Sequence, residues 1–151
     1  LIQYRMRWSP RTTVAAVITD ARGRYLLVEE APQGQPVLNQ PAGHLEPNES
    51  LLQAVVREVR EETCRDFHPR ALLGVYKWPL DETNTYLRFC FLGDVGEPIP
   101  ACTLDPDIRS AGWFNRTQLR DQALRSPLVM RCIEDAERGQ NFPLEVINEL
   151  S

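Results

Sequence analysis

The sequence predicts an α+β fold, layered α/β/α, in which a mixed β-sheet is flanked by helices. Short segments rich in β-branched and aromatic residues lie in both halves of the chain. A segment without glycine or proline separates them at 49–63, and two further helical segments follow near the C-terminus. Strands and helices mixed in this way pack as layers around one core. A length of 151 residues fits one domain of ordinary size, so we expect residues 1–151 to form a single domain.

The first third of the chain is expected to supply strands and a loop. Residues 12–20 and 24–30 are predicted strands, and the turn-forming residues 21–23 between them indicate a β-hairpin. A short strand is expected at 37–40. Residues 41–48 contain a glycine and two prolines, so we expect them to be irregular.

The segment from Glu49 to Thr63 is the most clearly marked helix. Asn48 is expected to be its N-cap, and Glu49 falls in the first turn, where the helix dipole favours an acid. At about 100° per residue, four apolar residues share one arc of this helix, and three acids share the neighbouring arc. The apolar residues are Leu52, Val55, Val56 and Val59, and the acids are Glu58, Glu61 and Glu62.

The second half is expected to contain another hairpin and two helices. Residues 72–78 and 85–94 alternate like paired strands and are joined by the turn-rich segment 79–84. Residues 112–114 are expected to form the last strand. Helices are expected at 116–123 and 128–138, with Pro127 at the N1 position and Gly139 after the second helix.

Composition and charge narrow the class of partner. The net charge is −4 and no basic run stands out, so the chain has no general attraction to nucleic acid or to an anionic membrane. The longest apolar stretches are far shorter than the ~20 residues that span a bilayer. We therefore expect neither a nucleic-acid nor a membrane partner, and the chain is expected to act as a monomer or a homodimer.

The cysteines and the first residues give information on the cellular compartment of the protein. No Cys-x-x-Cys pair occurs, so neither a zinc site nor a disulfide framework is expected from the four cysteines. Residues 1–6 lack the apolar core of a secretory signal. A reducing cytoplasm is the simplest location that these observations suggest. The cysteines are Cys64, Cys90, Cys102 and Cys132.

The three clustered acids allow two interpretations. Like charges three or four residues apart on a helix destabilise it by a few tenths of a kcal/mol each. One interpretation is a solvated acidic face, which is common on surface helices and is favoured by the spacing alone. The other is a cation site, because carboxylates are the hard oxygen ligands that Mg²⁺ prefers.

A longer motif shifts the balance towards the cation site. Gly43 is followed after five residues by Glu49, and after seven more by the run Arg57-Glu58-Val59-Arg60-Glu61-Glu62. This pattern resembles the Nudix box, and the predicted strands on both sides lie where a Nudix fold has strands. The resemblance implies a Nudix fold and hydrolysis of a phosphoanhydride bond. At its end the motif differs, because Cys64 stands where the family has a glycine suited to a left-handed helix C-cap.

The resemblance also implies a cofactor and roles for the motif residues. The cofactor would be Mg²⁺, with Mn²⁺ as an alternative. Glu58 and Glu62 would be metal ligands, Glu61 a ligand or the general base, and the carbonyl of Gly43 a further ligand. Arg57 would pair with Glu49 and hold the loop against the helix, although an ordinary surface ion pair is the alternative.

Within the family the chain is most similar to the NudJ-type branch. The residues that carry this likeness are 39–44, 86–89, 124–128 and 142–145. It implies nucleoside di- or triphosphates, or thiamin pyrimidine pyrophosphate, as substrates. The sequence does not discriminate between these substrates. A catalytically silent nucleotide-binding sensor module is the alternative to an enzyme, since a fold does not fix a function.

Several residues outside the motif are candidates for substrate contacts. Trp78 is expected to stack on a ring, and Tyr76 is as well placed for a half-buried structural role. Arg88 and Arg125 are candidates for holding phosphates, against a solvated role for each. His44 lies beside Gly43 and is a candidate contact. The loop acids Asp105 and Asp107 are assigned a turn role.

Overall fold

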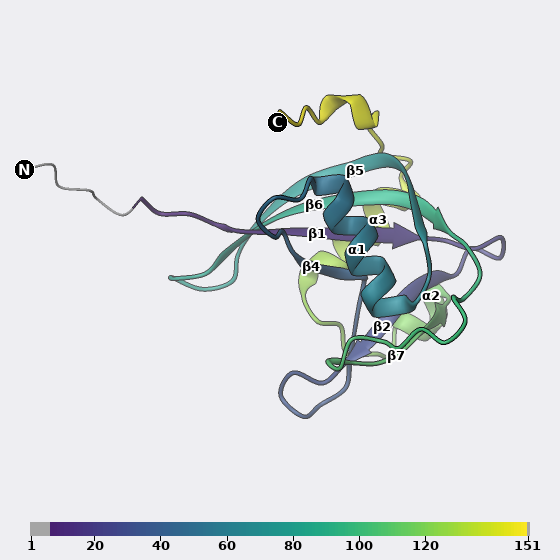
Figure 1. Cartoon of the computed structure of the whole chain (residues 1–151). Helices are drawn as coiled ribbons and strands as arrows, with labels where there is room; N and C mark the ends of the chain where they lie inside the picture. The colour runs from purple at the N-terminus through teal and green to yellow at the C-terminus, as the bar shows by residue number, and fades with distance from the viewer. Residues whose placement is uncertain (1–6, 151) are drawn as a thin grey trace, which may run out of the picture.

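The computed structural model describes residues 7–150 and contains seven strands, three α-helices and one 3₁₀ helix within that range. Figure 1 shows their arrangement. In chain order they are β1 (Arg11–Ile18), β2 (Tyr25–Glu30), β3 (Val37–Asn39), β4 (Ala42–His44), α1 (Leu51–Thr63), β5 (Phe67–Pro79), β6 (Thr85–Val95), β7 (Ile108–Phe114), α2 (Arg116–Leu119), α3 (Pro127–Glu137) and η1 (Leu144–Val146).

The strands form two sheets where the sequence predicted one. The larger sheet has the order β4-β1-β6-β5, and the smaller has the order β3-β2-β7. β1 runs parallel to β6 and antiparallel to β4, so the larger sheet is mixed as predicted. The mixture of strands and helices agrees with the predicted α+β class.

The first two strands are joined by the predicted turn, but they do not pair as the predicted hairpin. A single bridge joins Thr19 and Tyr25, after which β1 and β2 separate into different sheets. Both edges of β1 are already paired, with β4 and with β6, and β2 is paired with β3 and β7. The second predicted hairpin is confirmed, because β5 and β6 pair antiparallel over their length.

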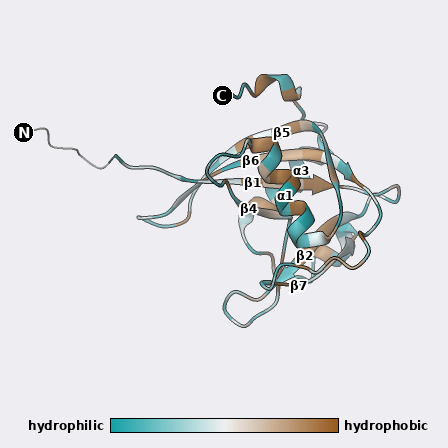
Figure 2. Cartoon of the chain, in the orientation of Figure 1, coloured by the Kyte–Doolittle hydropathy of each residue, from teal (hydrophilic) through white to brown (hydrophobic). Residues whose placement is uncertain are grey.

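Helices cover both faces of the larger sheet. In Figure 1, α1 crosses in front of the sheet and α3 lies behind it. Alternate residues of β1 serve the two sides: Val14 and Ala16 pack with the apolar arc of α1, and Ala15 and Val17 pack with α3. Figure 2 shows the corresponding split on α1, with brown apolar and teal polar stretches along the same helix. The predicted apolar arc is confirmed, since Val55 and Val59 are fully buried.

Several element boundaries differ from the prediction. α1 begins at Leu51, and its N-cap is Ser50, whose hydroxyl accepts from the Gln53 backbone N–H in a capping box. Asn48 has a left-handed φ of 64° and is therefore not the cap. Part of the segment expected to be irregular forms the edge strand β4, because Gly43 lies opposite Val14 of β1. The helix predicted at 116–123 is the short α2, and the η1 turn was not predicted.

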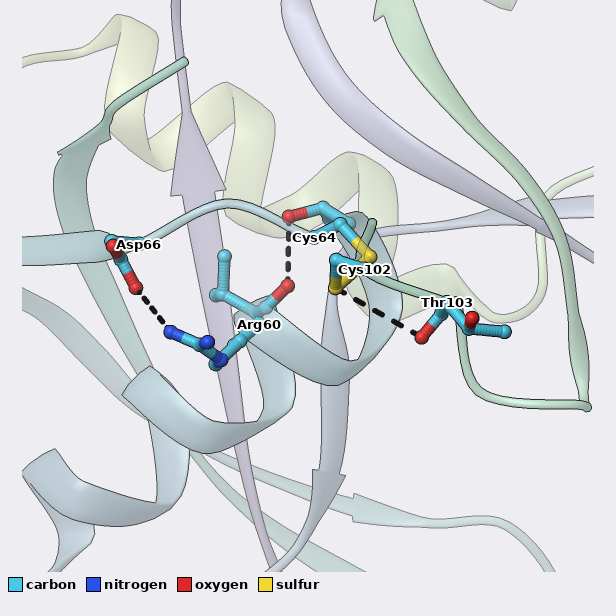
Figure 3. Close-up of a disulfide and its surroundings, with 7 residues drawn as sticks. Arg60, Cys64, Asp66, Cys102 and Thr103 are labelled. Carbon is cyan, nitrogen blue, oxygen red and sulfur yellow. Dashed lines mark hydrogen bonds and ion pairs between the residues drawn. A yellow bond between two sulfur atoms is a disulfide. The ribbon is translucent and has the colours of Figure 1, made fainter. Parts of the chain in front are cut away.

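The segment from 96 to 107 closes the C-terminal end of α1. Its backbone N–H groups at Ile99 and Asp105 donate to the carbonyls of Cys64 and Glu61, at 2.8 Å each. Those carbonyls belong to the helix end, where no partner within the helix is available. Figure 3 shows a disulfide between Cys64 and Cys102 at the same place. The loop that carries Asp105 is therefore fastened to the helix that carries the three glutamates.

The cysteine prediction is wrong for this pair. The Cα atoms of Cys64 and Cys102 lie 5.7 Å apart although 38 positions separate them in sequence. Cys64 has the left-handed conformation expected of the cap, with φ 55° and ψ 39°. Sequence spacing does not show such a pairing, because it depends on how the loop folds back onto the helix. Cys90 and Cys132 are buried free thiols.

We expect the disulfide and the left-handed cap to affect stability in opposite directions when Cys64 is changed to glycine. Under oxidising conditions, Cys64→Gly and Cys102→Ser should both lose about 2–4 kcal/mol of unfolding free energy, because the cross-link is removed. Under a thiol reductant, Cys64→Gly should exceed the wild type by up to ~1 kcal/mol, because glycine adopts positive φ without strain. Urea midpoints with and without reductant measure both effects. If the urea midpoint of the wild type is the same with and without reductant, the expected contribution of the disulfide is contradicted.

No helix within residues 7–150 is long and apolar enough to cross a membrane. The expectation that a secretory signal is absent concerns residues 1–6, which lie outside the described residues.

Candidate active site

Two of the three clustered glutamates are buried against the edge strand β4. The Glu58 side chain lies where a side chain on Gly43 would be: a Cβ built on Gly43 would come within 2.1 Å of the Glu58 carboxyl carbon. The backbone N–H of Ala42 donates to Glu62 Oε1 at 2.9 Å. Glu58 and Glu62 are each only 8% exposed. The solvated-face interpretation therefore fails for these two acids.

Burial changes the acidity of both carboxyls. Loss of hydration raises the pKa of Glu58, opposed by the Arg57 guanidinium and aided by Glu61 and Asp105. Loss of hydration also raises the pKa of Glu62, opposed by the Ala42 backbone N–H and aided by the negative charges of Glu58, Glu30 and Asp105, and together these effects bring it to about 9. A pair of buried acids in such surroundings is stabilised in the charged form by a cation placed between them.

Arg57 connects the acids and the preceding loop. Its guanidinium forms a two-pronged ion pair with Glu49, with Nη2 to Oε1 at 2.7 Å and Nε to Oε2 at 2.9 Å. The same group donates to Glu58 Oε1 at 2.7 Å and to the carbonyl of His44 at 3.0 Å. The predicted pairing of Arg57 with Glu49 is therefore present, and it raises the pKa of Arg57 and lowers that of Glu49.

Glu61 differs from its two neighbours. Its side chain is 43% exposed and receives a longer bond from Arg57 Nη1, at 3.3 Å. Its backbone carbonyl accepts from Asp105 N–H, which brings the loop acid beside the helix. Glu61 is thus the acid of the motif that is open to solvent.

A cavity of about 280 Å³ opens next to Glu62. The cavity reaches from β4 and the loop acids Asp105 and Asp107 over the face of the larger sheet that packs against α3. Residues of the three neighbouring strands β4, β1 and β6 lie directly opposite one another there: His44 opposite Thr13, and Thr13 opposite Arg88. Its lining also includes Glu30, Asn39, Gly43, Trp78, Tyr86, Asp105, Asp107 and Arg125.

The structure brings all four predicted substrate contacts to this cavity. Trp78 and His44 lie on either side of Tyr86, whose ring centroid is 5.9 Å from that of Trp78. Arg88 is almost fully buried and Arg125 is partly exposed, with a 3.5 Å ion pair to Glu30. Tyr76 is not among the lining residues, and its hydroxyl donates to Asp135 at 2.8 Å, so its structural role is confirmed.

Sequence reasoning gave some residues of the cavity no role or another role. Thr13 and Glu30 belonged to no motif, and Asn39 entered only through the family likeness at 39–44, although Thr13 lies on the β1 face that also carries Ala15 and Val17. Asp105 has its expected turn role, since its carboxylate accepts from Asp107 N–H at 3.0 Å. It also lines the cavity, which the turn assignment did not anticipate.

The arrangement fits a hard divalent cation. The carboxylates of Glu58 and Glu62 lie against the β4 backbone at Gly43 and Ala42, Asp105 is nearby, and together these groups offer oxygen atoms as ligands. Gly43 leaves the space that the Glu58 carboxylate fills. Across residues 7–150, no group of three or more acidic, histidine or cysteine side chains is arranged so that it alone could hold a metal ion. Mg²⁺ suits an open set of this kind, because it retains waters and takes further ligands from substrate phosphates.

Comparison with known proteins agrees with this geometry. The family model of the NUDIX domain matches residues 9–132. The chain is 37% identical over 145 residues to Phosphatase NudJ of Escherichia coli strain K12, covering 95% of this chain and 94% of that protein.

Solved structures give the same result. A NUDIX hydrolase from Nitrosomonas europaea superposes with a TM-score of 0.89 and 47% identity, covering 94% of this chain and 98% of the other. The MutT NUDIX hydrolase from Burkholderia pseudomallei superposes with a TM-score of 0.68 and 25% identity, covering 84% and 98%.

Proposed function

The chain belongs to the Nudix hydrolase family and is a NudJ-like phosphatase. From this premise we propose that it hydrolyses a phosphoanhydride bond in a nucleoside di- or triphosphate, or in thiamin pyrimidine pyrophosphate. The proposed cofactor is Mg²⁺ or Mn²⁺. We also propose that residues 1–151 act as one domain. The observation that carries the proposal is the burial of Glu58 and Glu62 against β4, with Glu62 lining the cavity.

The proposed roles follow from where each side chain lies. Glu58 and Glu62, with the Gly43 carbonyl, would hold the cation at the edge of β4. When bound there, it would neutralise phosphate charge and lower the pKa of the attacking water. Glu61, the exposed acid, is the third ligand or the general base that takes the water's proton. Arg57 fixes Glu58 and ties the loop at Glu49 to α1, which keeps the ligand oxygens in place.

The cavity supplies the rest of the substrate site. We assign Arg125 to the phosphates, because its guanidinium lines the cavity and is partly exposed. Trp78 and Tyr86 offer a stacked aromatic surface and His44 stands beside it. A sensor without turnover is the competing function. The presence of all three acids of the motif, two of them buried and Glu61 open to solvent, favours the enzyme.

Turnover of a substrate panel tests the proposal. Phosphate and pyrophosphate release are measured with nucleoside di- and triphosphates, ADP-ribose and thiamin pyrimidine pyrophosphate, each with and without Mg²⁺. We expect Mg²⁺-dependent release from at least one of them. Binding without release from any substrate would support the sensor.

Nucleotide binding is expected to require the cation. The net charge of −4 gives a polyanion no long-range attraction, and four carboxylates lie around the metal end of the cavity. At a hundredfold excess over its Kd, a nucleotide should stabilise the protein by about 2.7 kcal/mol with Mg²⁺ and by almost nothing with EDTA. Melting curves with and without chelator measure this. Equal protection in both would argue against a site bridged by a metal.

A further inference from the structure

The disulfide between Cys64 and Cys102 joins two segments at the end of the cavity where we place the cation (Figure 3). Cys64 follows Glu62 by two positions at the end of α1, and Cys102 precedes Asp105 by three positions on the loop. Asp105 lines the cavity together with Glu62, and its negative charge contributes to the raised pKa of Glu62. The cross-link therefore joins the helix of the buried acids to the loop that carries a further acid.

The remaining contacts leave the middle of this loop to the disulfide. Two backbone hydrogen bonds tie the loop to the end of α1, from Ile99 N–H to the Cys64 carbonyl and from Asp105 N–H to the Glu61 carbonyl. Between them, residues 100–104 form no hydrogen bond with α1 in the part of the chain that the structure describes. The disulfide is thus the contact that holds this span, which leads directly into Asp105.

The backbone at the cross-link has a conformation that ordinary residues avoid. Cys64 and Ala101, the residue before Cys102, both have left-handed φ values, 55° and 59°, although neither is a glycine. Such conformations are sparsely populated and persist where the surrounding structure holds them. Opening the disulfide removes one of these constraints, so the loop is free to relax around Ala101 and to shift Asp105.

The disulfide can be approached from the side of Cys102. Cys102 is half-buried between the exposed residues Ala101 and Thr103, whereas Cys64 is buried. A dithiol reductant attacks Cys102 Sγ as its thiolate, so that the S–S bond breaks and Cys64 leaves as a thiolate. The second thiol of the reductant then displaces Cys102 from the mixed disulfide. In total the protein disulfide gains two electrons and two protons, and the dithiol loses them as it becomes a disulfide.

We propose that Cys64 and Cys102 are positioning residues, whose disulfide holds Asp105 beside the buried glutamates, and that reduction by a dithiol lowers the affinity of the site for its cation. The proposal rests on the proposed function, since the cation site is part of it. Fixed carboxylates around a metal ion hold it more tightly than mobile ones, because supporting contacts orient them. A disulfide with a merely structural role would change the melting temperature and leave the cation affinity of the folded protein unchanged.

Binding of Mn²⁺ alone tests the proposal without turnover. The EPR signal of the free ion is lost on binding, which gives a Kd for the oxidised protein and for protein that is reduced with dithiothreitol and desalted under nitrogen. Thiol titration after unfolding should count the free Cys90 and Cys132 in the first form, and all four cysteines in the second. At a temperature where both forms are folded, the Kd of the reduced form should be roughly tenfold higher, a change typical of a lost supporting contact at a metal site.

Three variants identify the group through which the disulfide acts. Asp105→Asn should weaken Mn²⁺ binding in the oxidised form, and reduction should then change the Kd by less than about twofold, because the positioned carboxylate is gone. Glu97→Gln is the matched control, since it makes the same change at an exposed acid of the same loop and should keep the full effect of reduction. Cys102→Ser should bind Mn²⁺ as weakly as the reduced wild type, with or without the reductant.

The outcomes separate this proposal from the proposed function. Equal Kd values for the oxidised and reduced wild type, with melting curves that show both to be folded, would overturn it. A full effect of reduction in Asp105→Asn would overturn it as well. Absence of turnover in the substrate panel, with the redox difference in Mn²⁺ binding intact, would contradict the proposed function alone. Absence of Mn²⁺ binding in both forms would contradict both proposals.

Discussion

Glu62→Gln is expected to lower turnover by two to four powers of ten while the protein remains folded. Loss of a metal ligand or a base removes roughly 3–5 kcal/mol of transition-state stabilisation. Glutamine keeps the volume of the side chain, and its amide oxygen can still accept from Ala42 N–H, the contact that positions Glu62 Oε1. The measurements are kcat at saturating Mg²⁺ and a melting curve for the same preparation.

Two matched variants, Glu61→Gln and Glu49→Gln, rank the motif residues by the loss of turnover that each change causes. Glu61→Gln should fall in the same range as Glu62→Gln if Glu61 is a ligand or the base. Glu49→Gln should lose only about ten- to a hundredfold, because it acts through Arg57. Wild-type activity in Glu62→Gln would end the assignment of α1 as the metal-binding helix.

The stability difference between the wild type and Glu62→Gln should depend on pH. In the metal-free protein, burial raises the pKa of Glu62 from its ordinary 4.5 to about 9. The folded state then binds a proton more tightly than the unfolded state, so the wild type loses stability as the pH rises from about 4.5 to about 9. Glu62→Gln removes this contribution. Its unfolding midpoint in EDTA should therefore exceed that of the wild type by more at pH 8.5 than at pH 5.

Gly43→Ala should be nearly as damaging as loss of a glutamate. The new methyl group would lie within 2.1–2.4 Å of the Glu58 carboxylate, so the carboxylate must leave its place against β4. A displacement of about 1 Å at a catalytic group can cost roughly a hundredfold in rate, and we expect at least that loss in kcat. Stability should change little, because the Glu58 carboxylate can turn towards solvent.

Gly96→Ala is the control for this substitution. Nothing lies within 4 Å of a Cβ built on Gly96, so the same chemical change should leave turnover intact. Full activity of Gly43→Ala under the same conditions would show that the Glu58 carboxylate does not need this position.

The motif residues could be predicted from the sequence because their relation is local. Glu58, Glu61 and Glu62 lie on one helix, and their spacing alone places them on one arc. The pairing of Arg57 with Glu49 also follows from a short segment, since eight positions separate them. The fold class and the β5/β6 hairpin were predictable for the same reason, as each depends on neighbouring segments.

The remaining features depend on contacts between distant segments. Thr13, Asn39 and Arg88 line the same cavity, and the pairing of β1 with β6 brings Thr13 opposite Arg88. The sequence of any single segment does not predict this cavity. The disulfide from Cys64 to Cys102 likewise requires the loop at 96–107 to fold back on α1. The first hairpin was wrongly predicted because a turn signal shows that the chain reverses, and does not show which strand becomes its neighbour.

The parallel pairing of β1 with β6 also sets an order of events on the ribosome. Arg11 of β1 lies opposite Tyr86 of β6, so β1 is synthesised well before the strand with which it pairs. At about 5–20 residues per second, the wait lasts roughly 4–15 s. During that time β1 exposes an apolar run, Val14 to Ile18, that is buried in the finished protein. Until β6 emerges, this exposed apolar strand is a segment through which partly synthesised chains are prone to aggregate.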